Sequence, residues 1–260
     1  MLFSYTKLMY MKFFFKVLLT ILLFIFSFIY LKKAVYFIKM HDNLMQEIIA
    51  KEKDYGKEPI NAIITDNTMI PGLSGKKVNL DKSYNKMKKL NIFNESLLVF
   101  DDIKPNIRFE RNYDKIILRG NEKKKRISII LNINNDNLFN NLNDILKNNN
   151  LYADILTNNQ YYLENSYFKN IITTNYNKKT NYCLTYDLSI NSDCINNHKY
   201  TILGNNINNY YLTESKNILR NGIIIIYTFN ESNYYNLNTL IKYFKNNNYD
   251  IVTIDKLIKE

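Results

Sequence analysis

The feature that most constrains this chain is an apolar stretch near its beginning, Phe13–Leu31, in which Lys16 is the one charged residue. As a helix this stretch would be about 28 Å long, close to the hydrocarbon thickness of a bilayer. Lysines flank it on both sides, and the residues before Lys32 are too bulky for a signal-peptidase site. The sequence therefore favours an uncleaved signal anchor over residues 1–33, with the lipid bilayer as partner. The alternatives are a cleaved signal peptide and a buried core helix.

Two further segments separate this stretch from the main domain. Residues 34–58 mix apolar and charged side chains at partly helical spacing and end at Gly56 and Pro59, which predicts a helical stalk. Residues 59–120 contain short strand-like runs and a helix pattern at Lys82–Lys89. We expect them to form a small α+β module.

Residues 121–260 alternate between strand-like and helix-like patterns. Repeated strand–helix units imply an α/β domain with a largely parallel sheet and helices outside it. The expected strands are Ile127–Ile133, Leu151–Leu156, Ile171-Ile172, Tyr182–Thr185, Tyr200–Leu203, Gly222–Thr228 and Ile251–Ile254. The expected helices are Asn137–Asn149, Asn159–Lys169, Thr213–Leu219, Asn233–Asn247 and a terminal one after Asp255.

Any chemistry of this domain should lie at the carboxyl ends of its parallel strands, where ligands collect in such sheets. The first strand ends in Asn132 and Ile133, whose amide and aliphatic side chains are poorly suited to catalysis. Of the two histidines, His41 lies beside the apolar stretch, and His198 is alone in the C-terminal domain. A hydrolytic zinc site usually needs two or three histidines or several cysteines. The sequence therefore predicts no metal cofactor.

The positive charge is concentrated at the front of the chain. Of the formal net charge of +11, residues 1–119 contribute 20 lysines and arginines against 12 acidic residues, and residues 120–260 contribute 15 against 12. This distribution favours an anionic membrane surface or a cell-wall polymer as partner. No stripe of aromatic and arginine side chains suited to stacking on bases is visible, so we expect no nucleic-acid partner.

Cys183 and Cys194 are the two cysteines of the chain. In an exported domain such a pair can form a disulfide across the intervening loop. Two buried free thiols at strand ends are the alternative, and the sequence leaves both open.

Several sequence segments in residues 120–260 resemble segments of the NodB-homology polysaccharide deacetylase family. Leu151–Leu156 is similar to the family's second strand, Asn221–Thr228 to a late strand, and Tyr249–Leu257 to the closing segment. The front half resembles the membrane-anchored stalk of firmicute members, including Ile70–Val78. The resemblance implies a reduced, NodB-like distorted (β/α) barrel, preceded by a transmembrane helix and the small α+β module.

Members of this family bind a divalent metal such as zinc through one Asp and two His, with a second Asp as general base and a late His as general acid. Carried over to this chain, Asn132 stands at the base, Ile133 at the metal-binding Asp and Thr228 at the late His. An amide cannot accept the proton, and an aliphatic side chain has no lone pair for a metal. The interval Thr157–Asn181, where the two metal-binding histidines should lie, contains no His. The resemblance therefore implies that residues 121–260 form a degenerate domain with a vestigial site.

The resulting expectation is a single-pass protein of the cell membrane whose C-terminal domain is extracytoplasmic and catalytically inactive, with cell-wall polysaccharide as binding partner or scaffold. Tyr182, Tyr186 and Tyr227, with Tyr161 and Tyr162, are candidates for lining a glycan groove, unless they only pack in the core and loops. One alternative is an active N-deacetylase that hydrolyses the C–N bond of acetamido sugars in peptidoglycan or chitooligosaccharides with non-standard catalytic residues. The other is a purely structural membrane protein.

Overall fold

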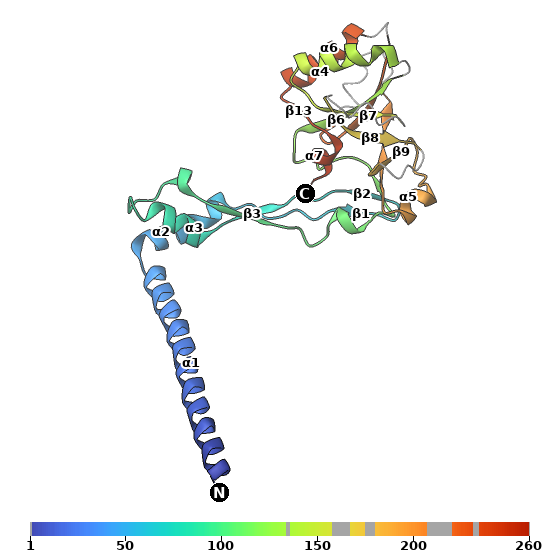
Figure 1. The fold of residues 1–260 in the computed structure, drawn as a ribbon. Coiled ribbons are helices and arrows are strands. Elements are labelled where there is room, and N and C mark those ends of the chain that lie inside the picture. Colours follow the sequence, from blue (N-terminus) through green and yellow to red (C-terminus); the bar gives the residue numbers. More distant parts are fainter. Residues whose placement is uncertain are drawn as a thin grey trace. The chain divides into compact units, whose positions relative to one another are not determined.

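The computed structural model describes residues 2–133, 136–157, 167–174, 180–206, 220–230 and 234–259. The chain divides into two compact units (Figure 1). The first contains residues up to 57 together with 76–102, and the second contains residues 58–75 and 103–260. The predicted module at 59–120 is therefore shared between the two units, because its central part packs with the helices that precede it.

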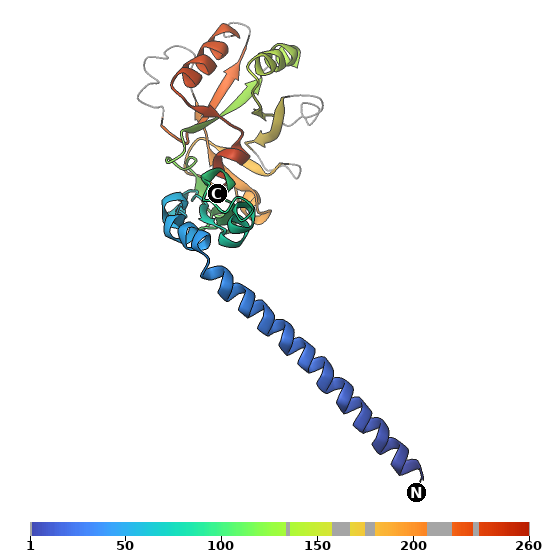
Figure 2. The same cartoon turned by 90° about the vertical axis from the view of Figure 1, so that its left-hand side faces the viewer.

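Helix α1 (Leu2–Met40) contains the apolar stretch as one unbroken helix (Figure 2). Of the helices in the described part of the chain, α1 is the one that is long and apolar enough to cross a membrane. The apolar window of its segment Phe14–Met40 has a mean hydropathy of 2.4, and no part of that window is buried. By length and composition it fits a membrane anchor or a signal sequence.

The residues of the predicted helical stalk lie in the end of α1 and in a second helix. After α1, the Asp42 side chain accepts a hydrogen bond from the Leu44 N–H and begins helix α2 (Asn43–Tyr55). Helix α2 packs against α3 (Leu80–Met87), and together they bury a small apolar cluster. The Lys39 ammonium pairs with the Asp81 carboxylate at 2.7 Å, which ties the end of α1 to the same unit. A two-stranded sheet, β3 (Gly75–Val78) and β4 (Phe100–Ile103), and a short 3-10 helix, η1 (Glu95–Leu97), complete this region.

The second unit is built on one long, mostly parallel sheet. Its order is β1-β2-β5-β10-β9-β8-β7-β6-β12-β11, with β13 pairing separately with β6, and the β1–β2 pair is antiparallel. The strands are β1 (Ile63–Ile64), β2 (Thr68–Ile70), β5 (Ile116–Ile117), β6 (Arg126–Ile133), β7 (Ala153–Leu156), β8 (Phe168–Thr173), β9 (Tyr182–Thr185), β10 (Tyr200–Leu203), β11 (Asn205–Asn206), β12 (Ile224–Phe229) and β13 (Asp250–Ile251). The helices are η2 (Phe109–Arg111), η3 (Asp136–Leu138), α4 (Phe139–Asn148), α5 (Ser192–Asn196), α6 (Tyr234–Asn246) and α7 (Ile254–Ile258).

Both faces of the central strands are buried, as their continuous apolar runs require. Successive residues of a strand point to opposite faces, so Ile127, Ile129 and Leu131 of β6 pack under α4 and α6. Ile130 points to the other face, where the sheet curls around α7 and its residues Ile254 and Leu257. The result is a curled half-barrel with helices outside, as the sequence predicts.

One predicted helix differs from the structure. Asn159–Lys169 was expected to be helical, but Phe168 and Lys169 lie in strand β8, because the Phe168 ring is buried in the core between the sheet and α4. The earlier part of that prediction, 158–166, lies outside the described residues, as does the whole of Thr213–Leu219.

Candidate functional site

The carboxyl ends of β6 and β12 bring together two of the three positions at which the resemblance expects a base, a metal ligand and an acid. In the register of this parallel pair, Asn132 lies opposite Thr228 and Ile133 opposite Phe229. The Asn132 Nδ2 group donates to the Thr228 hydroxyl over 3.4 Å. Strand alternation turns Ile133 to the opposite face, where it packs against the helix-side core.

The donor set at this edge does not fit a divalent metal. Zinc in hydrolases is bound by imidazole, thiolate or carboxylate groups. Asn132 offers an amide, Thr228 a hydroxyl and Ile133 only carbon. In the described part of the chain, no three or more His, Cys, Asp or Glu side chains gather in a way that could hold a metal ion. No catalytic step through a metal can therefore be assigned to these residues.

The three candidate tyrosines lie in different environments. Tyr227 is 2% exposed, in the core between the sheet and its outer helices, and burial raises its pKa to about 12. Tyr182 is 5% exposed, and its O–H donates to the Asp255 carboxylate. Burial is the main cause that raises the pKa of Tyr182, and the hydrogen bond to the Asp255 carboxylate raises it further. Core packing thus accounts for both.

Tyr186 follows the carboxyl end of β9 and is 48% exposed. Of the three tyrosines, it is the one whose ring offers free surface at this edge of the sheet. Tyr161 and Tyr162 lie outside the described residues.

Cys183 and Cys194 form a disulfide, with an S–S distance of 2.04 Å. The bond joins β9 to α5, and both cysteines are buried. His198 lies just beyond α5, where its ring packs against Tyr113 at a centroid distance of 5.1 Å. Of the two alternatives that the sequence left open, the structure therefore has the disulfide and not two free thiols.

Asp154 is a buried carboxyl that the sequence analysis did not single out. It is fully buried on β7, and its oxygens accept hydrogen bonds from Asn170 Nδ2 at 2.7 Å, the Ile254 N–H at 2.6 Å and the Ser128 hydroxyl at 3.4 Å. Burial raises its pKa to about 7 against the lowering effect of these donors. The bond to Ile254 fixes the start of α7 on the sheet. The signal in the sequence is an aspartate inside the apolar run Ala153–Leu156, which indicates a buried carboxyl group.

Comparisons of the whole sequence give limited information. No family model matches the chain. Over 93 residues, 35% of this chain, it is 36% identical to a Bacillus subtilis (strain 168) protein named "Uncharacterized protein YlxY". The match spans 29% of that protein's length.

Comparisons with solved structures identify the fold. The chain is similar to BA3943, a CE4 family pseudoenzyme from Bacillus anthracis, with a TM-score of 0.60 and 21% identity over 85% of this chain and 96% of the other. A BA3943 mutant with restored enzymatic activity gives a TM-score of 0.58 and 21% identity over 84% of this chain and 99% of the other. The chain therefore has a NodB-homology polysaccharide deacetylase-like fold, which confirms the fold expected from the resemblance.

Proposed function

We propose that this protein is a membrane-anchored, extracytoplasmic, deacetylase-like pseudoenzyme that binds or scaffolds cell-wall glycan. The observation that carries the proposal is the chemistry at the carboxyl edge, where Asn132 and Thr228 pair with each other and Ile133 follows Asn132. By the resemblance, these are the positions of a base, an acid and a metal ligand. None of these side chains can take a proton from water or bind zinc strongly. The similarity to solved pseudoenzymes of the same fold supports this assignment.

The anchor is supported by the continuity of α1. The helix runs without a break from the apolar stretch to Met40, and Lys39 near its end pairs with Asp81 of the folded unit. An apolar helix with no buried share of its window needs a lipid environment to cover it.

The placement outside the cytoplasm is supported by the Cys183–Cys194 disulfide, because such bonds persist in oxidising compartments. Protease treatment of intact cells tests this placement. We expect the C-terminal domain to be digested from outside, and its protection until the membrane is permeabilised would overturn the proposal.

The catalytic part of the proposal is tested by acetate release. The full chain in detergent micelles, with added zinc, should release no acetate from peptidoglycan or chitooligosaccharides above the level of a protein-free control. Release that a chelator abolishes would instead establish an active N-deacetylase with non-standard residues.

The glycan-binding part is tested by sedimentation with purified peptidoglycan. Because the chain carries a net charge of +11, the pellet should be washed at high salt to remove purely electrostatic retention. We expect the wild-type chain to stay bound and Tyr186→Ala to lose most of its retention, since Tyr186 provides an exposed ring at the carboxyl edge. Leu188→Ala is the matched control, because Leu188 is exposed nearby but offers no aromatic face. No retention of the wild-type chain would favour a purely structural role.

A further inference from the structure

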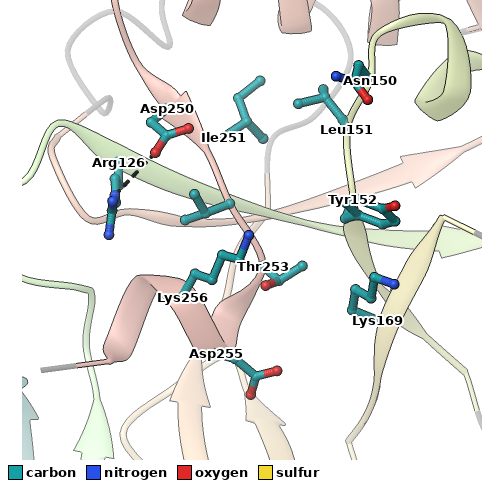
Figure 3. A pocket seen from close by; sticks show the side chains of 11 residues that line it. Arg126, Asn150, Leu151, Tyr152, Lys169, Asp250, Ile251, Thr253, Asp255 and Lys256 are labelled. Carbon is teal, nitrogen blue, oxygen red and sulfur yellow. Dashed lines mark ion pairs between the residues drawn. The ribbon is translucent and has the colours of Figure 1, made fainter.

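A cavity of about 680 Å³ opens at the opposite edge of the sheet, where the parallel strands begin (Figure 3). Its volume falls within the usual range for small-molecule sites. It is separated from Asn132 by the length of β6, about 20 Å at roughly 3.3 Å per residue. Its lining comes from the starts of β6 and β8, the segment before β7, β13 and α7. It includes Arg126, Tyr152, Lys169, Asp250, Thr253 and Lys256.

The cavity forms because β13 and β7 pair with different parts of β6. Strand β13 pairs with Arg126 and Ile127, ahead of the point at which β7 joins β6 at Ile130. The segment that leads into β7, Asn150–Tyr152, therefore runs beside β13 without pairing with β6. The space left between these two segments is the cavity.

The charges in the cavity are only partly neutralised. Arg126 Nε pairs with Asp250 Oδ2 at 3.2 Å, and Asp255 accepts the hydrogen bond of Tyr182. The Lys169 ammonium lies 4.2 Å from the centroid of the Tyr152 ring. Among the described residues, no carboxylate forms an ion pair with Lys169 or with Lys256. The two lysines are therefore available to an anion.

The remaining lining suits a hydroxyl-bearing ligand. The Thr253 side chain is buried at the start of α7 and makes no capping hydrogen bond with it. Tyr152 is 44% exposed, and Leu151 and Ile251 add apolar surface. Figure 3 shows Lys256 reaching from α7 into the middle of the site, with Asp250 on one side and Tyr152 on the other. The carboxylates of Asp250 and Asp255 can accept hydrogen bonds from hydroxyl groups and would disfavour a ligand with more than one anionic group.

We propose that this cavity binds a sugar or polyol that carries a single phosphate or carboxylate group. The anionic group meets Lys169 and Lys256, and the hydroxyl groups meet Asp250, Thr253 and Asn150. A neutral ligand would leave both ammonium groups without a partner, and a fatty ligand would bury them at high cost. This site does not depend on glycan binding at the carboxyl edge.

Calorimetric titration of the full chain in detergent micelles tests the proposal with three probes: glucose 6-phosphate, glucuronate and glucose. At equal ionic strength we expect at least one of the two anionic sugars to bind at least tenfold more tightly than glucose. The tighter of the two identifies phosphate or carboxylate as the preferred anionic group. Equal affinity for glucose, or no binding of any probe at millimolar concentration, would overturn the proposal.

Two variants assign the binding to this cavity. Lys169→Gln and Lys256→Gln should each weaken the binding of the preferred anionic sugar about tenfold, since each removes a charge-assisted hydrogen bond. Lys242→Gln removes an exposed lysine on α6 outside the cavity and should leave the affinity unchanged. Wild-type affinity in both cavity variants would rule the site out. Retention on peptidoglycan should be unaffected by these variants, which separates this test from that of the carboxyl edge.

Discussion

Asn132 of β6 and Thr228 of β12 face each other across a parallel strand pair, and the Asn132 amide donates to the Thr228 hydroxyl over 3.4 Å. The resemblance to the deacetylase family places a general base and a general acid at these two positions, and this chain has there a hydrogen bond between two groups that do not titrate near neutral pH. Neither residue can therefore act as an acid or a base near neutral pH.

Restoring one carboxylate should not restore activity. Asn132→Asp supplies a base, but Ile133 offers no oxygen to a metal and the interval Thr157–Asn181 contains no His, so zinc still lacks its ligands. Thr228 also supplies no imidazole to act as a general acid. We expect no acetate release from a chitooligosaccharide with added zinc. A chelator-sensitive rate in this variant would show that other residues complete a metal site.

Asp154 should make the stability of the protein depend on pH. Its pKa in the folded protein, about 7, is above the ordinary value of 3.8, so the folded state holds the proton more tightly than the unfolded state does. This contribution to stability is full below pH 4 and is lost as the pH rises from about 4 to about 7.

Asp154→Asn should flatten the pH dependence over that interval, because an amide does not titrate. Thermal unfolding of the full chain in micelles at several pH values measures the effect. The matched control is Asp250→Asn, which removes a carboxylate that is exposed. An unchanged pH profile in Asp154→Asn would mean that another group is responsible.

The Cys183–Cys194 bond should stabilise the second unit by about 3 kcal/mol, as expected from the entropy of closing a short loop. The sequence separation of the two cysteines is 11. Cys183→Ser with Cys194→Ser should therefore lower the midpoint of urea unfolding, and reductant should have the same effect on the wild-type chain only. A reductant-dependent shift in the double variant would contradict this explanation.

Gly222 should not tolerate a side chain. Its φ of +81° is in the left-handed region, and a Cβ atom there would lie 2.2 Å from the Gly120 carbonyl oxygen. Gly222→Ala should cost at least about 2 kcal/mol of stability, from backbone strain together with the clash. Gly56→Ala is the matched control, because its nearest contact would be 3.4 Å and its φ is negative. Equal stability of the two variants would refute the prediction.

The membrane anchor should fail when charge is placed in its middle. Leu22→Arg with Leu23→Arg adds about 5 kcal/mol or more to the cost of insertion, since each central arginine costs roughly 2.5–3.5 kcal/mol. We expect the protein to move from the alkali-washed membrane fraction to the soluble fraction. Leu22→Val with Leu23→Val keeps the stretch apolar and should remain in the membrane. Membrane retention of the arginine variant would point to a different mode of attachment.

Much of the fold could be predicted because its determinants are local. The strand Tyr200–Leu203 was predicted with the bounds that it has in the structure, and the predicted strand Ile127–Ile133 differs from β6 by one residue at its start. The apolar runs, the helix periodicity of α4 and α6, and the length of the apolar stretch in α1 are all read from neighbouring residues. The absence of histidine between Thr157 and Asn181 is likewise a property of the sequence alone.

Other features depend on residues that are distant in the chain. The sequence predicts Phe168 in the helix Asn159–Lys169, but core packing places it in β8. The segment 76–102 joins the first unit because α3 packs against α2, which local patterns cannot indicate.

The sequence by itself determined the long apolar helix, the alternation of strands and helices, and the absence of carboxylate and imidazole groups at Asn132, Ile133 and Thr228, because each is fixed by residue type and spacing along the chain. Only the tertiary structure decided that Asp154 accepts the Ile254 N–H and that β13 meets β6 at Arg126 and so opens the cavity at the amino edge. Both are contacts between segments about a hundred residues apart, and their energy depends on burial and register, which the linear order of residues does not contain.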